Sequence, residues 1–462
     1  MLNATKPADT SATSMFLTAV FARWRGFVGA SPLRRLGHDA LVAAGTSLAA
    51  RSVGFAKEIV VAAHFGLSGN LDVYFVAFTL IGFPLAILLN AVQTAFIARL
   101  SANISAAEGK RLYSLTAVGT LLILLLLLPL WLLFVPHALP WLASGFPPEK
   151  RQALETALLW LIPYYFLNGL NLLGYGVLQT KRRYLQNGLL PAATPLVIML
   201  TLLVIGATSG WHILVAALVA GTATECALLL MTLHRIGCIG LPRLSSLHAL
   251  KPILANSLIL LPGTAIGSLV MLVEQAIAAS LGEGSNAALL YGYRLPAALQ
   301  SLFVTAIGIT ALPYFASQIA QRQHDYCLHS LNKLYWVLGV GGIMIALPLV
   351  VFSPEITALL YQRGAFDAAA VARVAPVQTA YFIQIPFALL AMLGIKTLAA
   401  LGRNAQVSLI AASAAILQGM LAYFLTRQLG AAGIAWAATV ISALISTLTY
   451  IAARTALKQH TP

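Results

Sequence analysis

Long apolar stretches follow one another along almost the whole chain, and this pattern constrains the fold more than any other feature. One of the clearest is Leu121–Val135, which Leu115–Gly119 extends at its start. A helix that crosses a bilayer needs roughly 20 apolar residues. Only 9% of the 462 residues are charged, whereas soluble domains contain about 25%. So few charges cannot cover a surface in water, and the sequence therefore predicts a protein surrounded largely by lipid.

The apolar stretches predict an all-α polytopic membrane protein, because a lipid environment leaves backbone polar groups unsatisfied unless each segment is a helix. We expect about twelve transmembrane helices, at approximately residues 39–64, 70–98, 112–136, 152–179, 187–207, 211–233, 252–281, 286–317, 332–352, 373–401, 404–426 and 431–453.

The positive charges are distributed unevenly between the links that join these spans. With the N-terminus placed in the cytoplasm, 19 of the 28 Lys and Arg residues fall on the cytoplasmic side, five on the opposite side and four inside spans. Cytoplasmic links of membrane proteins carry such an excess of cations. The bias therefore predicts that both termini lie in the cytoplasm, and it explains the net charge of +15 without any binding of nucleic acid.

The chain also resembles itself at a shift of 216 positions. Without gaps, that shift aligns Glu58 with Glu274, Ala62 with Ala278, Ala63 with Ala279, Gly66 with Gly282, and Asn70 with Asn286. Six spans separate the two copies, so both have the same orientation, as in transporters built from parallel repeats. We therefore predict two six-helix lobes around a central cavity: residues 38–240 hold spans one to six and residues 241–455 hold spans seven to twelve, with cytoplasmic tails at 1–37 and 456–462.

Several charged side chains lie inside the predicted spans, where insertion of a charge costs at least ~2.5–3.5 kcal/mol. The first span contains Arg51, Lys57 and Glu58, the second begins with Asp72, and the eighth contains Arg294. We interpret the cations as the lining of a cavity that binds a phosphate or diphosphate through charge-assisted hydrogen bonds. The alternative is that they form buried ion pairs, such as Arg51 with Glu58, or extend to the membrane surface.

Two further charges inside spans are candidates for the same site. Lys396 in the tenth span adds a fourth cation, although it lies only seven residues before Arg403. Glu274 in the seventh span is either a carboxylate that couples transport to a cation or a partner for Arg294. The residues alone leave both interpretations of Glu274 open.

A stretch of the first two spans resembles the opening motif of the MurJ/MviN family, within the multidrug/oligosaccharidyl-lipid/polysaccharide (MOP) exporter superfamily. Arg51, Gly54, Phe55 and the run Asp72–Phe78, interrupted at Val73 and Tyr74, match that motif, while Lys57 and Glu58 replace its Arg-Asp pair with the charges kept. The segment around Arg294, the stretch Leu360–Phe366 and Lys396 are also similar to family positions.

The resemblance implies a flippase that moves lipid II, an undecaprenyl-diphosphate-linked glycan of peptidoglycan synthesis, across the bacterial inner membrane by alternating access. It implies a cavity lined by Arg51, Lys57, Glu58, Asp72 and Arg294. With the other charges found inside spans, we expect binding through Arg51, Lys57, Arg294 and Lys396, and Glu58, Asp72 and Glu274 as supporting or coupling acids. We expect no cofactor and no metal, but either a coupling cation (Na⁺ or H⁺) or the membrane potential as the driving force. The expected partners are the anionic lipid-linked glycan and membrane lipids, and we expect the protein to work as a monomer.

Other functions compete with this one. A related flippase would move the lipid-linked repeat unit of an exopolysaccharide or O-antigen. A small-molecule antiporter like those of the multidrug and toxin extrusion (MATE) type would favour an acidic cavity for cationic drugs, which the cations argue against. No P-loop, G-x-S-x-G or HExxH motif is present, so the sequence does not predict an enzyme.

Two departures from the family concern the substrate. The family's second span contains a functional Arg, but the corresponding stretch here, Phe83–Asn90, contains no cation. Family members commonly have fourteen spans, of which the last two help to form a groove for the lipid tail, and about twelve are expected here. Both departures weaken the case for lipid II and make a related glycolipid the alternative cargo, although lipid II remains the first expectation.

Overall fold

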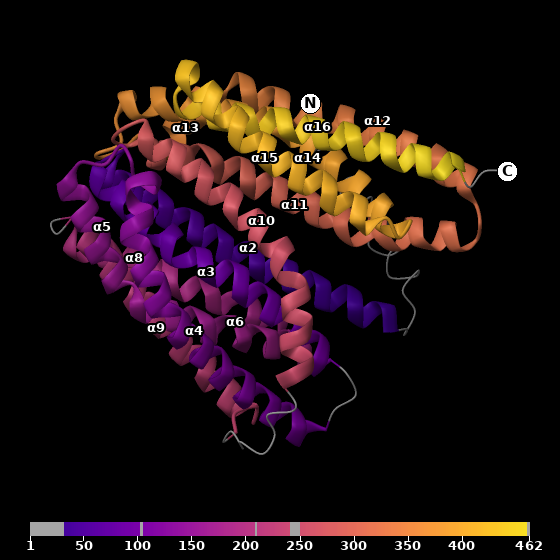
Figure 1. Ribbon diagram of the computed structural model, residues 1–462, viewed down its shortest axis with the longest axis horizontal. Coiled ribbons are helices and arrows are strands. Elements are labelled where there is room, and N and C mark those ends of the chain that lie inside the picture. The colour runs from indigo at the N-terminus through magenta and orange to yellow at the C-terminus, as the bar shows by residue number, and fades with distance from the viewer. Residues whose placement is uncertain (1–31, 102–104, 208–209, 241–249, 460–462) are drawn as a thin grey trace, which may run out of the picture.

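The computed structural model (Figure 1) describes residues 32–101, 105–207, 210–240 and 250–459, and every secondary-structure element in these ranges is a helix. The predicted N-terminal tail therefore lies almost entirely outside the described residues. The first half contains α2 (Pro32–Phe65), α3 (Gly69–Leu100), α4 (Ala106–Leu142), α5 (Pro148–Trp160), α6 (Ile162–Thr180), α7 (Tyr184–Leu189), η1 (Leu190–Ala192), α8 (Ala193–Ile205) and α9 (Trp211–Arg235). The second half contains α10 (Lys251–Ser280), α11 (Ser285–Ala320), α12 (His324–Val351), α13 (Ser353–Tyr361), α14 (Ala368–Ala400), α15 (Asn404–Leu429) and α16 (Ala431–Gln459).

The described helices confirm a helical protein that crosses a membrane many times. By length and composition, eight helices can span a bilayer, or up to ten if each of two bent pairs is one span. The bent pairs are α5 with α6, at 46°, and the two parts of α10 on either side of Pro262, at 44°. Helices α2, which contains Arg51, Lys57 and Glu58, and α11, which contains Arg294, are not among these eight helices and two bent pairs. The count of twelve spans stays a prediction.

The helices form two groups that converge at one end and separate toward the other (Figure 1). We call these the narrow end and the wide end. Helices α3 to α9 make one group and α11 to α16 the other, and the tips of α5 and α13 lie at the narrow end. The largest buried apolar cluster contains residues from both halves, including Phe75, Tyr165, Tyr291 and Phe366. Apolar packing therefore joins the halves through this shared core.

Helix α10 connects the two groups. It packs most extensively along α3 and also contacts α15. The bend follows from Pro262, because proline lacks the N–H that would continue the helical hydrogen bonds. The predicted division into lobes at residue 240 stays a prediction, and α10 is the helix that passes from one group to the other.

The self-similar segments form equivalent turns at the narrow end. Gly66 follows α2 with φ +55°, and Gly282 follows α10 with φ +99°; both lie in the left-handed region that favours glycine. The turn after α2 leads into α3, as the turn after α10 leads into α11. The aligned glycines therefore have the same structural role in the two halves.

A second pair of contacts relates the halves at the same end. A Cβ added to Gly364, in the loop after α13, would collide with the carbonyl oxygen of Ala63 in α2. A Cβ added to Gly145, in the loop after α4, would collide with the carbonyl oxygen of Ala279 in α10. Because Ala63 and Ala279 are aligned positions, each half offers an equivalent helix end to a glycine loop of the other half.

Candidate functional site

Three of the predicted site residues form one cluster of charges. The carboxylate oxygen Oε1 of Glu58 accepts a hydrogen bond from Lys57 Nζ at 2.7 Å and lies 2.8 Å from Arg294 Nη2. The exposed fractions of the side chains are 5% for Glu58, 12% for Lys57 and 40% for Arg294. We call these three residues the charge cluster. It joins α2 to α11 and carries two cations for one anion.

The carboxylate of Glu58 therefore pairs with Lys57 and Arg294, and not with Arg51. This arrangement combines the two interpretations of the sequence, because the cations form a buried ion pair and still leave one positive charge in excess. Arg294 also keeps further N–H groups beyond the one that faces Glu58, since a guanidinium has five.

Aromatic side chains lie beside the charge cluster, toward the narrow end. Tyr291 packs against Tyr361 at 5.1 Å between ring centroids, against Phe366 at 5.8 Å and against Phe75 at 6.0 Å. The hydroxyl groups of Tyr291 and Tyr361 are buried and make no hydrogen bond within the described part of the chain. Apolar surroundings strengthen electrostatic interactions because they lower the local dielectric constant. The rings therefore form an apolar surface on one side of the charge cluster, which we call the aromatic wall.

The other two predicted cations lie further along α2 and α14. Arg51 is exposed, and its Nη1 donates to Ser301 Oγ of α11 at 2.6 Å. It lies seven residues, or about two helical turns, before the charge cluster on α2 and contacts the same partner helix. Lys396 is half-buried and lies near Gly308 of α11. The structure thus places both cations beside α11, but neither is part of the charge cluster.

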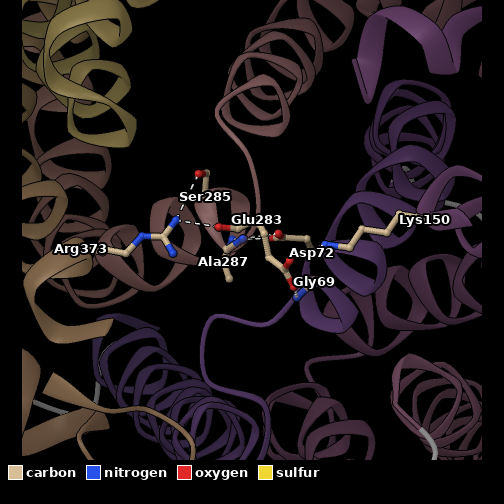
Figure 2. Close-up of polar contacts among 8 residues, drawn as sticks. Gly69, Asp72, Lys150, Glu283, Ser285, Ala287 and Arg373 are labelled. Carbon is tan, nitrogen blue, oxygen red and sulfur yellow. Dashed lines mark hydrogen bonds and ion pairs between the residues drawn. The ribbon is translucent and has the colours of Figure 1, made fainter. Parts of the chain in front are cut away.

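Asp72 lies at the narrow end and caps a helix of the other half. Its carboxylate accepts the backbone N–H of Gly284 at 2.5 Å and that of Ala287 at 3.1 Å, at the start of α11 (Figure 2). The first N–H groups of a helix have no partner within the helix, and the helix dipole favours a negative charge there. Asp72 is 1% exposed, so its carboxylate is buried between the halves in this structure.

Glu283 makes the reciprocal contact from the other half. It precedes α11, and its Oε1 accepts the backbone N–H of Gly69 at the start of α3 at 2.5 Å. Its Oε2 lies 3.0 Å from Lys150 Nζ of α5, and Arg373 Nη2 of α14 donates to its backbone oxygen at 2.8 Å (Figure 2). The hydrogen bond from Lys150 lowers the pKa of Glu283. We call the contacts of Asp72 and Glu283 the end latch.

The stretch Leu360–Phe366 completes the closure of the narrow end. The backbone N–H of Ala365 donates to the carbonyl oxygen of Ala63 at 2.7 Å, and the preceding Gly364 has φ +59°. The same stretch supplies Tyr361 and Phe366 to the aromatic wall. A motif noted only for its resemblance to a family therefore holds the loop after α13 against α2.

Glu274 lies in a separate cavity of the second half. Its Oε1 accepts a hydrogen bond from Gln418 Nε2 at 2.6 Å, and no described cation pairs with it. The cavity has a volume of about 340 Å³ and is also lined by Gln275, Tyr293 and Tyr381. Both polar atoms of the Gln275 side chain are buried and have no hydrogen-bond partner among the described residues. Arg294 pairs with Glu58. The carboxylate that faces Arg294 is therefore that of Glu58, and not that of Glu274.

Sequence reasoning missed the residues whose role depends on distant contacts. Glu283 and Lys150 appear in the sequence as ordinary charges of loops, and no local pattern indicates that each meets the other half of the chain. The tyrosines of the aromatic wall stand in motifs that we singled out, next to Arg294 and in Leu360–Phe366, but without a predicted role. The signal that would have found them is the presence of an aromatic residue in every motif that surrounds the buried charges.

Comparison with known families shows where the chain belongs. The family described as "Lipid II flippase MurJ" matches residues 61–461 of this chain, which is most of its length. A protein of Synechocystis sp. named "Probable lipid II flippase MurJ" is 26% identical over 90% of this chain and 81% of its own. A "Lipid II flippase MurJ" of Burkholderia cenocepacia is 26% identical over 74% of this chain and 69% of its own.

Solved structures show the same fold. A structure described as "Lipid II flippase MurJ, inward closed conformation" aligns with a TM-score of 0.72 at 18% identity, and the alignment covers 89% of this chain and 87% of that one. An inward-facing MATE transporter of the MOP superfamily aligns with a TM-score of 0.70 at 13% identity, over 91% of this chain and 98% of its own. The fold of the MOP superfamily and the match to residues 61–461 confirm the resemblance: the chain belongs to the MurJ family of lipid II flippases.

Proposed function

We propose that this chain is a transporter, and not an enzyme, that moves lipid II across the bacterial inner membrane. The observation that carries the proposal is the charge cluster, in which two cations share one carboxylate where the two helix groups meet. The names of the relatives support lipid II as the cargo. They do not favour an exopolysaccharide or O-antigen unit, although the second span lacks the family's Arg and only eight to ten of the described helices pass as spans.

The excess positive charge explains how the diphosphate of the cargo would bind. Arg294 is 40% exposed and offers N–H groups in the planar geometry that suits phosphate oxygens. Arg51 is exposed beside the same helix. A cationic drug would be repelled by this arrangement, which argues against a MATE-like antiporter. Neutralisation of the excess charge by an anion would also offset the cost of the second buried cation.

The two ends of the molecule fit alternating access. The end latch and the loop after α13 close the narrow end, whereas the helix groups separate toward the wide end. The bias of positive charge supports a cytoplasmic position for the wide end, where α6 and α9 finish. We therefore interpret the structure as open toward the cytoplasm, where the cargo would enter.

Complementation of a bacterial strain depleted of its lipid II flippase tests this function. Wild-type protein should restore survival, and Arg294→Ala should not, although it should reach the membrane in equal amount. Arg403→Ala, which removes a half-buried cation at the wide end, is the matched control and should restore survival. Failure of the wild-type protein, or survival with Arg51→Ala and Arg294→Ala combined, would contradict the proposal.

Coupling to a cation is a finer part of the proposal. Glu274 offers a carboxylate without a cationic partner among the described residues, in a cavity that also contains amide and hydroxyl groups. Such a site suits Na⁺ or H⁺, while the membrane potential is the alternative driving force. Glu274→Gln should abolish the dependence of lipid II transport on one of these ions in proteoliposomes. Unchanged ion dependence in that variant would leave the membrane potential as the source. We expect a monomer to carry out the cycle, because the charge cluster and the latch form within one chain.

A further inference from the structure

A basic pocket lies at the wide end of the first helix group, outside the transport site. Three cations line it: Lys110 near the start of α4, and Lys181 and Arg183 after α6. The pocket has a volume of about 250 Å³. None of its lining residues is acidic, and within the described residues no carboxylate forms an ion pair with these three cations. We call it the basic pocket.

The cations converge because two loops are fixed in place. After α9, the backbone N–H of Gly240 donates to Ser114 Oγ at 3.2 Å, and Ser114 Oγ donates to the Gly240 carbonyl oxygen at 2.6 Å. This pair of bonds holds the loop on α4. Burial raises the pKa of the Cys238 thiol in that loop, and the positive charges of Lys181 and Lys110 oppose the rise. The ammonium groups of Lys181 and Lys110 are therefore both close enough to affect the Cys238 thiol, which lines the pocket.

The turn after α6 adopts an unfavourable backbone conformation that brings Arg183 into the pocket. Arg182 has φ +54°, and the N–H of Arg183 donates to the Leu178 carbonyl oxygen at 2.9 Å. The turns after α11 and α14 have the same hydrogen bond, from Gln323 to Gln318 and from Arg403 to Leu398. They contain Arg322 with φ +57° and Gly402 with φ +73° at the corresponding position. Glycine is the usual residue there. Arg182 shares this turn conformation with Arg322, and it belongs to the run Lys181–Arg183 that lines and flanks the pocket.

The nearest acid in sequence is already engaged. Glu108 stands two residues before Lys110, and its Oε2 accepts the backbone N–H of Ser105 at 2.9 Å and the Ser105 hydroxyl at 3.0 Å. The arrangement is a capping box at the start of α4. Cations after the last turn of α6 also complement the helix dipole, but that effect does not require a third cation from α4 in the same pocket.

The remaining lining indicates the kind of anion. Leu100, Val177 and Ile236 give the pocket an apolar wall. They stand at or next to the ends of α3, α6 and α9, at the level where spanning helices leave the hydrocarbon and lipid headgroups begin. Basic pockets between helices on the cytoplasmic side bind headgroups of anionic lipids. We propose that the basic pocket binds the phosphate of an anionic phospholipid of the inner leaflet, separately from the transported cargo.

Thermal unfolding of the full chain in detergent tests the proposal, with phosphatidylglycerol, phosphatidylcholine or inorganic phosphate added. Phosphatidylglycerol should raise the Tm, because a ligand that binds the folded state stabilises it, and phosphatidylcholine should not. The triple variant Lys110→Gln, Lys181→Gln and Arg183→Gln should bind phosphatidylglycerol roughly 100-fold more weakly, since each cation near the membrane surface contributes about fivefold.

The matched control neutralises three cations at the same end of the second half: Arg403→Gln, Arg454→Gln and Lys458→Gln. It has the same net charge as the pocket variant and should keep the wild-type response to phosphatidylglycerol. Equal responses of the two triple variants, or no response of the wild type, would overturn the proposal. An equal response of the wild type to inorganic phosphate would overturn the assignment to a lipid. If the pocket triple variant does not fold, Lys181→Gln alone should show about a fivefold loss. Survival of the flippase-depleted strain is read separately, so failure of the transport function leaves this test intact.

Discussion

At the scale of single residues, Glu58 sets the net positive charge of the charge cluster. It is the shared partner of Lys57 and Arg294. Removal of one partner from a buried ion pair leaves the other charge without compensation and is strongly destabilising. The acid therefore has two effects, since it makes the cations tolerable in the protein interior and also sets their net charge.

Glu58→Gln should lower the free energy of unfolding by about 3 kcal/mol, because the largely buried Lys57 and the partly exposed Arg294 then face each other without an anion. The double variant Lys57→Gln with Glu58→Gln restores the wild-type net charge of the cluster and should regain most of that loss. Chemical denaturation followed by tryptophan fluorescence measures both. A double variant no more stable than the single one would show that geometry, and not net charge, governs the site.

The end latch should respond to acid through Glu283. Its pKa is lowered in the folded protein, so the contribution of its ionised form is fully present above the unfolded value of about 4.3 and is lost as the pH falls through the lower, folded value. Lys150, Arg373 and Asp72 are the charged groups that face it. Spin-label distances across the narrow end should lengthen below about pH 4, and Glu283→Gln should lose this Glu283-dependent step of the pH response.

At the scale of elements, the narrow end is closed by pairs of equivalent contacts between helix ends and loops. Gly145 and Gly364 meet the carbonyl oxygens of Ala279 and Ala63. These oxygens belong to the last turns of α10 and α2, so a loop of each half covers a helix end of the other. The approach is possible only because glycine has no side chain.

Gly145→Ala should therefore destabilise the closed end, by about 1–3 kcal/mol as for other overpacked sites. The added methyl group would collide with backbone atoms, which have little freedom to move. Gly341→Ala in α12 is the control, since nothing lies within 4 Å of its Cβ position. A thermal shift that is equal in both variants would mean that the loop after α4 moves aside without cost.

The sequence predicted the elements better than their contacts. The apolar stretches located most helices, and the charges inside them located Lys57, Glu58 and Arg294, because lipid makes each such charge conspicuous. Asp72 was found as a charge at the start of a predicted span and also matches a family position. Its role as the cap of α11, however, depends on backbone groups more than 200 residues away. The sequence puts Glu283 and Lys150 in the links between predicted spans, where a charge is unremarkable. Local sequence patterns could therefore not predict the contacts of the end latch.

At the scale of the whole molecule, we propose that the wide end faces the cytoplasm, because cations gather there. Lys110, Lys181, Arg235 and Arg403 all lie at the wide end. Alkaline phosphatase fused after Ala143, at the narrow end, should be active because it is exported. Fusions after Lys181 or Lys458 should be inactive. The opposite pattern would invert the assignment of the wide end to the cytoplasm.

The end latch has a consequence for the opening of the narrow end. Each half supplies an acceptor that the first turn of a helix in the other half lacks, so separation exposes two helix starts at once. If only the contact of Asp72 or only that of Glu283 breaks, the other still holds the halves together. The halves can therefore separate only when both contacts are broken. Opening should therefore be cooperative, with few molecules in a half-open form, and water on that side must replace both acceptors in the same event.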